Sequence, residues 1–494
     1  MLFNSFEFLV FFPTVVGLYF LLPHRFRWAL LLIASYTFYM FWRVDYAIIL
    51  VISTLIDYVC GRMMDRYSEE ERTKRKPWLW LSLLSNLGIL FTFKYYNFFN
   101  TAAKDLADVL GVSYAAPAFE LLLPMGISFY TFQTMSYSID VYYGRQKAER
   151  HLGIFALFVT FFPQLVAGPI ERAGNLLGQL KEKHEFDYDR VTNGLKLIAW
   201  GLFKKVVIAD RLALMVNQVY NNPTDYEGIP LIIATVFFAF QIYCDFSGYS
   251  DIAIGTAQVM GFRLMENFRR PYFSKSIREF WSRWHISLST WFRDYLYIPL
   301  GGNRVVKWRW YYNLFVVFLV SGLWHGANWT FIVWGALHGF YQVFGLLTAK
   351  RRDALVERLG LNRNRTFYKA LQVITTFALV CLAWVFFRAN TISDAWYITT
   401  HMFQNLAGST KEFVTQLAFG GVEHLRWLDR KEFILALLFI GVMEGAHYLQ
   451  RNRKLRLHIT DFNPVLRWGL YSVCLLILIY FGVFSSNEFI YFQF

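Results

Sequence analysis

Two histidines lie in apolar, aromatic surroundings where an ionisable side chain is unusual. His325 is found in "SGLWHGANWTF", residues 321–331, and His285 in "FWSRWHISLSTWFRDYLYIPLGGNR", residues 280–304. A neutral imidazole has one nitrogen that accepts a proton and another that donates a hydrogen bond, which suits a general base near neutral pH. These residue types therefore make His325 a candidate catalytic base, with a structural buried histidine as the alternative. For the His285 motif the alternative is an interfacial amphipathic segment with an aromatic belt.

Five polar or aromatic side chains in the same motifs or in a nearby one are candidates for the wall of a substrate tunnel. They are Tyr243 and Asp245 in "QIYCDFSGYSDIAIGTA", Arg293 in the His285 motif, and Trp324 and Asn328 beside His325. A charged aspartate at membrane depth needs a partner or a wet cavity, so Asp245 marks either a functional site or a structural network. Both alternatives stay open for it.

Three more ionisable residues have simpler interpretations. His338, 13 residues after His325, is expected to bond a neighbouring helix. Glu444 and His447 are spaced i, i+3, which favours a hydrogen-bonded pair over a pair of metal ligands.

The four cysteines are widely separated and form no CxxC pair, so no metal site is predicted. No GxSxG, P-loop, HExxH or Rossmann glycine pattern competes with the histidines.

The composition is that of a membrane protein. Of the 494 residues, 56% are hydrophobic, 20% aromatic and 17% charged, with a mean hydropathy of +0.33. Soluble domains have about 45–50% apolar and about 25% charged residues. The formal net charge of +14 would suggest nucleic acid as the partner of a soluble protein. Here the Lys and Arg gather in loops beside apolar blocks, as cytoplasmic loops of membrane proteins do, so no nucleic-acid partner is predicted.

The sequence predicts an all-α polytopic membrane protein with about 12 transmembrane helices, because blocks of roughly 18 or more apolar residues span a bilayer. The predicted spans are 3–22, 29–43, 45–60, 78–96, 118–139, 194–216, 229–260, 311–326, 329–348, 370–388, 432–449 and 466–486. The first lacks a basic region and a cleavage site, so it is expected to be a retained helix and not a signal peptide.

Two further apolar segments are broken and are expected to be re-entrant or interfacial. Residues 152–170 contain Pro163, Gly168 and Pro169, and residues 281–302 mix aromatic side chains with charged ones. Non-helical backbone at membrane depth persists only inside protein or along a cavity.

The distribution of basic residues agrees with this count. Most Lys and Arg lie in loops 61–77, 144–151, 261–310, 349–369 and 450–460. If the two broken segments do not cross, all these loops share the cytoplasmic side. Loops 97–117, 217–228 and 389–431 and both termini are then extracytoplasmic.

Several motifs together resemble the membrane-bound O-acyltransferase (MBOAT) superfamily. "RWHISLSTWFRDYLYIPLGGNR" followed by "SGLWHGANWTFIVWGALHG" carries the resemblance, and "FFPQLVAGPIER", "YCDFSGYSDIAIG", "ENFRRPYFSKSIREFW" and "SSNEFIYFQF" extend it nearly from end to end. The branch typified by the alginate O-acetylation membrane subunit is the most similar. The teichoic-acid D-alanylation branch shares both histidine motifs.

The resemblance implies one MBOAT domain over 1–494, with N-terminal helices in 1–140, a catalytic core in 141–348 and C-terminal helices in 349–494. It implies a helix bundle with a central tunnel in a bacterial inner membrane, with His325 as the catalytic histidine and His285 as the second polar position. The implied reaction is acetyl transfer from acetyl-CoA or an acyl carrier to an extracytoplasmic polysaccharide, alginate-type exopolysaccharide being favoured, or to a partner acetyltransferase. Acetyl-CoA would be a co-substrate, and no cofactor is expected.

Other functions stay open at this point. Peptidoglycan or cellulose O-acetylation and D-alanyl transfer from a carrier protein use the same chemistry on other substrates. A transporter would also need many helices, broken segments and buried aspartates. A scaffold of an export complex would instead depend on exposed surfaces such as loop 389–431. The pair of histidine motifs favours the enzyme.

Overall fold

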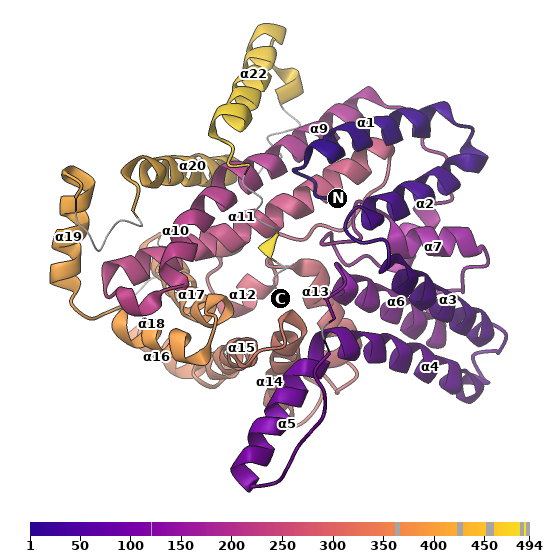
Figure 1. The fold of residues 1–494 in the computed structure, drawn as a ribbon, viewed down its shortest axis with the longest axis horizontal. Helices are drawn as coiled ribbons and strands as arrows, with labels where there is room; N and C mark the ends of the chain where they lie inside the picture. Colours follow the sequence, from indigo (N-terminus) through magenta and orange to yellow (C-terminus); the bar gives the residue numbers. More distant parts are fainter. Residues whose placement is uncertain (120, 361–365, 422–427, 451–458, 485–488, 491–494) are drawn as a thin grey trace. The chain divides into compact units, whose positions relative to one another are not determined.

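The protein is all-helical in a computed structural model that describes every residue except 120, 361–365, 422–427, 451–458, 485–488 and 491–494 (Figure 1). Parts of the basic loops 349–369 and 450–460, of loop 389–431, of the predicted span 466–486 and of the C-terminal motif therefore lie outside the described residues. The helices group into two compact units, one formed by Met1–Ile198 with Tyr249–Glu266, the other by Ala199–Gly248 with Asn267–Phe494.

The first unit is built from helices α1 to α8, most of α9 and the last part of α11. Their bounds are α1 (Phe6–Leu21), α2 (His24–Met40), α3 (Ala47–Met64), α4 (Arg72–Leu90), the π-helix η1 (Phe91–Tyr95), α5 (Tyr96–Leu110), α6 (Ile127–Tyr142), α7 (Leu152–Thr160), α8 (Ala173–Gln179), α9 (Tyr188–Leu202) and α11 (Ile229–Met260).

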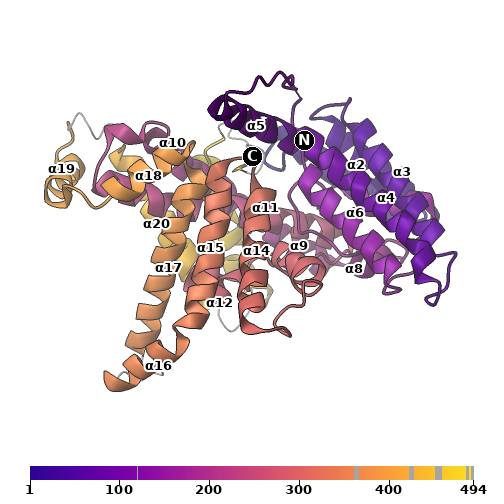
Figure 2. The same ribbon diagram turned by 90° about the horizontal axis from the view of Figure 1, so that it is seen from below.

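The second unit holds both candidate catalytic histidines. It contains the end of α9, the π-helix η2 (Phe203–Ala209), α10 (Asp210–Tyr220), η3 (Pro223–Asp225), the first part of α11, η4 (Pro271–Phe273), α12 (Ile277–Trp281), α13 (Ile286–Phe292), the π-helix η5 (Arg293–Tyr297), α14 (Lys307–His325), α15 (Trp329–Leu347), α16 (Ala349–Arg358), α17 (Thr366–Arg388), α18 (Ile392–His401), α19 (Leu406–Ala418), α20 (Arg430–Leu449), η7 (Ile459–Asp461) and α22 (Pro464–Phe481). Figure 2 shows α14, α15 and α17 side by side, with α16 at one end and α18 at the other.

Six helices within the described residues are long and apolar enough to cross a membrane. They are α3, α11, α15, α17, α20 and α22. Several other predicted spans correspond to shorter helices such as α1, or to helices with more polar residues such as α14. The prediction of a polytopic all-α membrane protein is confirmed.

The helix boundaries differ from the predicted spans where proline, glycine or a π-helix intervenes. The span expected over 118–139 begins only at Ile127, because Pro124 and Gly126, whose φ is +74°, precede the helix. The segment expected to be broken, 152–170, is one short helix that ends at Thr160, before Pro163. The span expected over 194–216 is a longer helical stretch with a π-helix in its middle.

Buried hydrogen bonds hold α3, α4 and α6 together in the first unit. Asp57 of α3 is inaccessible to solvent and accepts hydrogen bonds from Ser82 Oγ at 2.5 Å and Asn86 Nδ2 at 2.8 Å. Ser138 of α6 joins them, since its Oγ lies 2.8 Å from Ser82 Oγ and 3.4 Å from Asp57 Oδ1. Polar side chains thus take the place of water as partners of the carboxylate, as burial requires.

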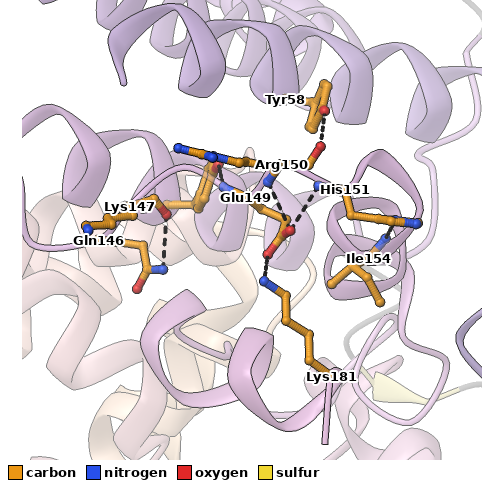
Figure 3. A network of polar contacts seen from close by, with 9 residues as sticks. Tyr58, Gln146, Lys147, Glu149, Arg150, His151, Ile154 and Lys181 are labelled. Carbon is orange, nitrogen blue, oxygen red and sulfur yellow. Dashed lines mark hydrogen bonds and ion pairs between the residues drawn. The ribbon is translucent and has the colours of Figure 1, made fainter. Parts of the chain in front are cut away.

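A second network orders the basic loop that precedes α7 (Figure 3). The Glu149 carboxylate accepts the backbone N–H groups of Arg150 and His151, both at 2.9 Å, and pairs with Lys181 Nζ at 2.5 Å. His151 Nδ1 in turn accepts the N–H of Ile154 at 3.1 Å and caps α7. Hydrogen bonds from the loop's own backbone and the ion pair with Lys181 therefore both fix the conformation of this loop.

Glycine allows α14 and α15 to approach closely in the second unit. A Cβ on Gly322 would lie 2.3 Å from the carbonyl oxygen of Phe331, and one on Gly335 would lie 2.4 Å from the carbonyl oxygen of Phe318. Small residues at such crossings are a common means of helix association in membranes. The contact fixes the hairpin whose turn carries His325.

We expect Gly322→Ala to destabilise the protein by about 1–3 kcal/mol, because the added methyl group cannot be accommodated between two backbones. The matched control is Gly345→Ala on α15, where a Cβ would meet nothing within 4 Å. The midpoint of thermal unfolding in detergent micelles measures both. Equal midpoints for the two variants would show that the close packing of α14 and α15 is not needed.

Candidate active site

His325 is the last residue of α14 and lies at the turn into α15. Gly326 is extended, with φ −161° and ψ 149°, and the Asn328 side chain accepts the N–H of Thr330 at 3.1 Å to start the next helix. The imidazole is 2% exposed. The sequence "WHGAN" thus ends one helix and caps the next within three residues, which places His325 at the tip of a helical hairpin.

Aromatic rings surround the His325 imidazole. Its centroid lies 4.9 Å from those of Trp324 and Trp334, and 5.4 Å from that of Phe387. The Trp334 ring is almost perpendicular to the imidazole, at 85°. Such walls keep water away from the imidazole and lower the local dielectric, which strengthens any hydrogen bond formed there.

His285 lies in the break between α12 and α13 and is fully buried. Its backbone is left-handed, with φ 44° and ψ 55°, a conformation that costs a non-glycine residue roughly 1–2 kcal/mol. Asn267 braces the break: its carbonyl oxygen accepts the N–H of Ile286 at 2.9 Å, and its side-chain oxygen accepts the Ser287 hydroxyl at 3.0 Å. Strained backbone held in this way is common at functional sites.

The two histidines share one aromatic neighbour. The Trp324 ring is 4.9 Å from the His325 ring and 6.1 Å from the His285 ring. Phe246 of α11 covers His285 from another side, at 4.6 Å between centroids. Four segments far apart in sequence, namely α11, the α12–α13 break, the α14–α15 hairpin and α17, therefore converge on one buried cluster. We call it the histidine cluster: His285, His325, Trp324, Trp334, Phe246 and Phe387.

His338 lies beside this cluster and bonds a neighbouring helix, as the simpler interpretation expects. Its Nδ1 accepts the indole N–H of Trp281 on α12 at 3.2 Å. Because Nδ1 is an acceptor, the proton of the neutral imidazole is on Nε2. Its ring lies 5.0 Å from the ring of Trp334, on which His325 also packs.

Asp245 belongs to an ion network. Its carboxylate pairs with Lys205 Nζ at 2.8 Å, and the same ammonium pairs with Asp210 at 2.9 Å. The second oxygen of Asp245 accepts the N–H of Ile490 at 2.8 Å, which fixes a short buried part of the C-terminal segment. The adjacent ring of Phe489 packs on Phe246, at 5.7 Å. Asp245 is thus connected to the histidine cluster through Phe246, the next residue in the chain, and through Phe489, which packs on Phe246.

The other predicted wall residues have separate positions. Tyr243 is buried, with its ring 6.2 Å from that of Trp284 and its hydroxyl 3.4 Å from His447 Nε2. Glu444 and His447 form the expected hydrogen-bonded pair, at 3.3 Å. Asn328 is a helix cap whose amide also reaches the Asn390 carbonyl at 3.4 Å. Arg293 pairs with Asp294 at 2.8 Å, with over half of its side chain exposed, and has no described contact with the histidine cluster.

Several residues of the site were missed in the sequence. Lys205 and Asp210 both stand in the apolar block 194–216, and two opposite charges there are a signal that points to a buried pair. Phe246, Phe387 and Asn267 carry no such signal, because only the fold brings them to the histidines.

We expect Lys205→Met to destabilise the protein by about 3–5 kcal/mol, since it leaves two buried carboxylates without a counter-charge. Lys74→Met is the control, because Lys74 and Glu71 form an exposed ion pair. Thermal unfolding in detergent should show a large drop for the first variant and little change for the second. Replacing Asp210 and Asp245 by Asn as well should restore much of the midpoint. A Lys205→Met protein as stable as the parent would contradict the ion network.

Comparison with known proteins identifies the family. The sequence profile of MBOAT, the membrane-bound O-acyltransferase family, matches residues 151–389, which include both histidines of the site. The probable alginate O-acetylase AlgI of Pseudomonas aeruginosa is 42% identical over 82% of this chain and 75% of its own length.

Two other relatives are named for peptidoglycan and for teichoic acid. The peptidoglycan O-acetyltransferase of Helicobacter pylori is 34% identical over 94% of this chain and 91% of its own. The teichoic acid D-alanyltransferase of Bacillus subtilis is 29% identical over 56% of this chain and 71% of its own. With this extent of similarity, the chain belongs to the membrane-bound O-acyltransferase family and is a membrane O-acyltransferase.

Proposed function

We propose that this protein transfers an acetyl group from acetyl-CoA on the cytoplasmic side to a polysaccharide hydroxyl on the other side of a bacterial inner membrane, directly or through a partner protein. The observation that carries the proposal is the burial of two histidines against one tryptophan, in the region that matches the family. The names of the relatives favour acetyl as the acyl group and alginate-type exopolysaccharide as the acceptor.

The chemistry needs a base and a hydrogen-bond donor. A nitrogen of His325 takes the proton of the attacking hydroxyl as its oxygen forms a bond to the thioester carbonyl carbon. His285 donates a hydrogen bond to the carbonyl oxygen, where negative charge develops. The C–S bond then breaks, the leaving thiolate takes the proton from His325, which becomes neutral again, and the ester remains on the acceptor.

The surroundings of the histidines fit these roles. The aromatic walls of the histidine cluster exclude water, which limits hydrolysis of the thioester and strengthens the hydrogen bonds at the reacting oxygen. The left-handed backbone of His285 and its brace by Asn267 hold one imidazole in a fixed place. Trp324, which touches both imidazoles, would form the wall between them.

The same proposal includes the topology. About twelve spans with two broken segments that do not cross place the basic loops on the cytoplasmic side. The Lys and Arg of loop 261–310 then attract the phosphates of the donor, and a central tunnel leads to His325. The extracytoplasmic end meets the acceptor polymer or an acetyltransferase partner.

Peptidoglycan is the second candidate acceptor. The observation in its favour is the relative whose similarity covers 94% of this chain. The two candidates differ only at the acceptor end, so one assay with both polymers separates them.

We expect His325→Gln to reduce acetyl transfer by about 10²–10⁴-fold, because glutamine preserves polarity but cannot take the proton. The measurement uses radiolabelled acetyl-CoA and an acceptor polymer with the protein in proteoliposomes. His24→Gln is the control, since His24 only bonds the Lys181 carbonyl at the surface of the first unit. Label on the acceptor at the parent rate in a folded His325→Gln protein would refute the base. Transport without covalent labelling would instead indicate a transporter.

We expect His285→Asn to keep more activity than His285→Ala. Asparagine tolerates the left-handed backbone and retains a donor group, whereas alanine does neither. Loss of one oxyanion donor lowers the rate by about 10²–10³-fold, which is the expected result for alanine. Single-turnover acetyl transfer at saturating donor measures both variants. If the two variants lose the same amount of acetyl-transfer activity, His285 does not act as a hydrogen-bond donor.

A further inference from the structure

Arg388 is a cation held by amides. It ends α17, and its Nη2 donates to the side-chain oxygens of Asn217 at 2.7 Å and Asn221 at 3.1 Å. Its Nη1 donates to the side-chain oxygen of Asn390 at 3.4 Å, and the guanidinium lies 5.5 Å from the centre of the Tyr220 ring. Asn217 and Asn221 are four residues apart at the end of α10, so they present one face to the guanidinium.

Among the residues that the structure describes, no acidic oxygen lies within ion-pair distance of Arg388, so no described carboxylate neutralises its charge. Two acids of the adjoining segments have other partners: Glu227 accepts the Asn405 amide at 2.6 Å, and Asp394 accepts the N–H of Thr391 at 3.2 Å. A guanidinium stays charged in proteins, and an amide oxygen has only a partial charge to offer it.

A cation suits the last turn of α17, but the position of Arg388 does not follow the distribution of basic loops. Arginines beside membrane spans normally belong to the basic loops of the cytoplasmic side. Loop 217–228 contains no Lys or Arg, and loop 389–431 contains Lys411 and, at its end, Arg426, Arg430 and Lys431. Arg388 is therefore separated in sequence from the other basic residues of these loops.

Arg388 lies at the same end of α14, α15 and α17 as His325 (Figure 2). The residue before it, Phe387, packs its ring 5.4 Å from the His325 imidazole. The Asn390 carbonyl accepts the amide of Asn328, three residues after His325. Trp329, at the start of α15, is 54% exposed at this end. Arg388 and His325 therefore lie at the same end of these helices, joined through Phe387 and the Asn328–Asn390 contact.

We infer that Arg388 binds a carboxylate of the acyl acceptor, a polysaccharide whose sugars carry carboxylate groups. This inference rests on the proposed function and names its acceptor class. The exposed Asn390 forms the longest of the three hydrogen bonds and is the partner that an incoming carboxylate replaces, while Asn217 and Asn221 keep the guanidinium in place. A guanidinium and a carboxylate then form two parallel hydrogen bonds, which orient the sugar as well as bind it.

The experiment compares two acceptors with the full-length protein in proteoliposomes. One is an oligouronate, and the other is the same oligosaccharide with its carboxylates reduced to alcohols. We expect the parent protein to have the higher kcat/KM for the oligouronate. Arg388→Gln should lower that value by about 10- to 100-fold, mainly through KM, and leave the value for the reduced oligosaccharide unchanged. The kcat/KM of Arg388→Lys for the oligouronate should lie between those of the parent protein and of Arg388→Gln.

Two controls separate this effect from folding and from general charge. Lys411→Gln removes another basic residue of loop 389–431 and should leave kcat/KM unchanged for both oligosaccharides. Thermal unfolding of Arg388→Gln detects loss of the tie between α10 and α17. Equal loss of activity with both acceptors, or no preference in the parent protein, overturns the inference and leaves Arg388 as a structural residue.

Failure of the proposed function gives different results. If His325→Gln still labels the oligouronate at the parent rate, the catalytic assignment fails whatever Arg388 does. If neither oligosaccharide is labelled but a co-reconstituted partner protein is, in a reaction that needs His325, the acceptor is a protein and the carboxylate site is refuted.

Discussion

A lipid bilayer offers no water to a backbone amide, so each break in a buried helix must be satisfied by protein. The site is built from two such breaks. At one of them Asn267 supplies acceptors for Ile286 and Ser287, and at the other Asn328 accepts the N–H of Thr330. Each break leaves a histidine at its tip. The need to satisfy the backbone therefore explains why the imidazoles have fixed positions, and the rest of the site follows from those positions.

The second unit buries polar side chains in two different environments. The histidines are surrounded mostly by aromatic rings, which exclude water from the imidazoles. Lys205, Asp210 and Asp245 instead compensate one another as charges and hold helices and the C-terminal segment in place. An acyltransferase needs both: reactive groups that are free to change protonation, and a scaffold whose charges do not.

Much of the fold follows from hydropathy, whereas the site follows only in part. The long apolar blocks predicted α11, α15, α17 and α20 to within a few residues, because length and apolarity determine a span. The histidine pair was predicted from residue type and resemblance. The left-handed φ of His285, the contact of both imidazoles with Trp324 and the position of Arg388 among amides were not, since each depends on packing between distant segments. The helices α18 and α19 within the predicted loop 389–431 were also missed, because their amphipathic sequences are too short and too polar for a span.

The π-helix η2 has a consequence for how the sequence can change. Lys205 and Asp210 are five residues apart, a spacing that an α-helix would place about 140° apart around its axis. In the wider turn the N–H of Asp210 bonds the carbonyl of Lys205, and the two side chains meet on one face. The wider turn takes up one residue more than an α-helical turn, and a deletion between the two charges would leave them four residues apart, still on one face of an α-helix. The segment can therefore lose a residue in this turn and keep the Lys205–Asp210 pair.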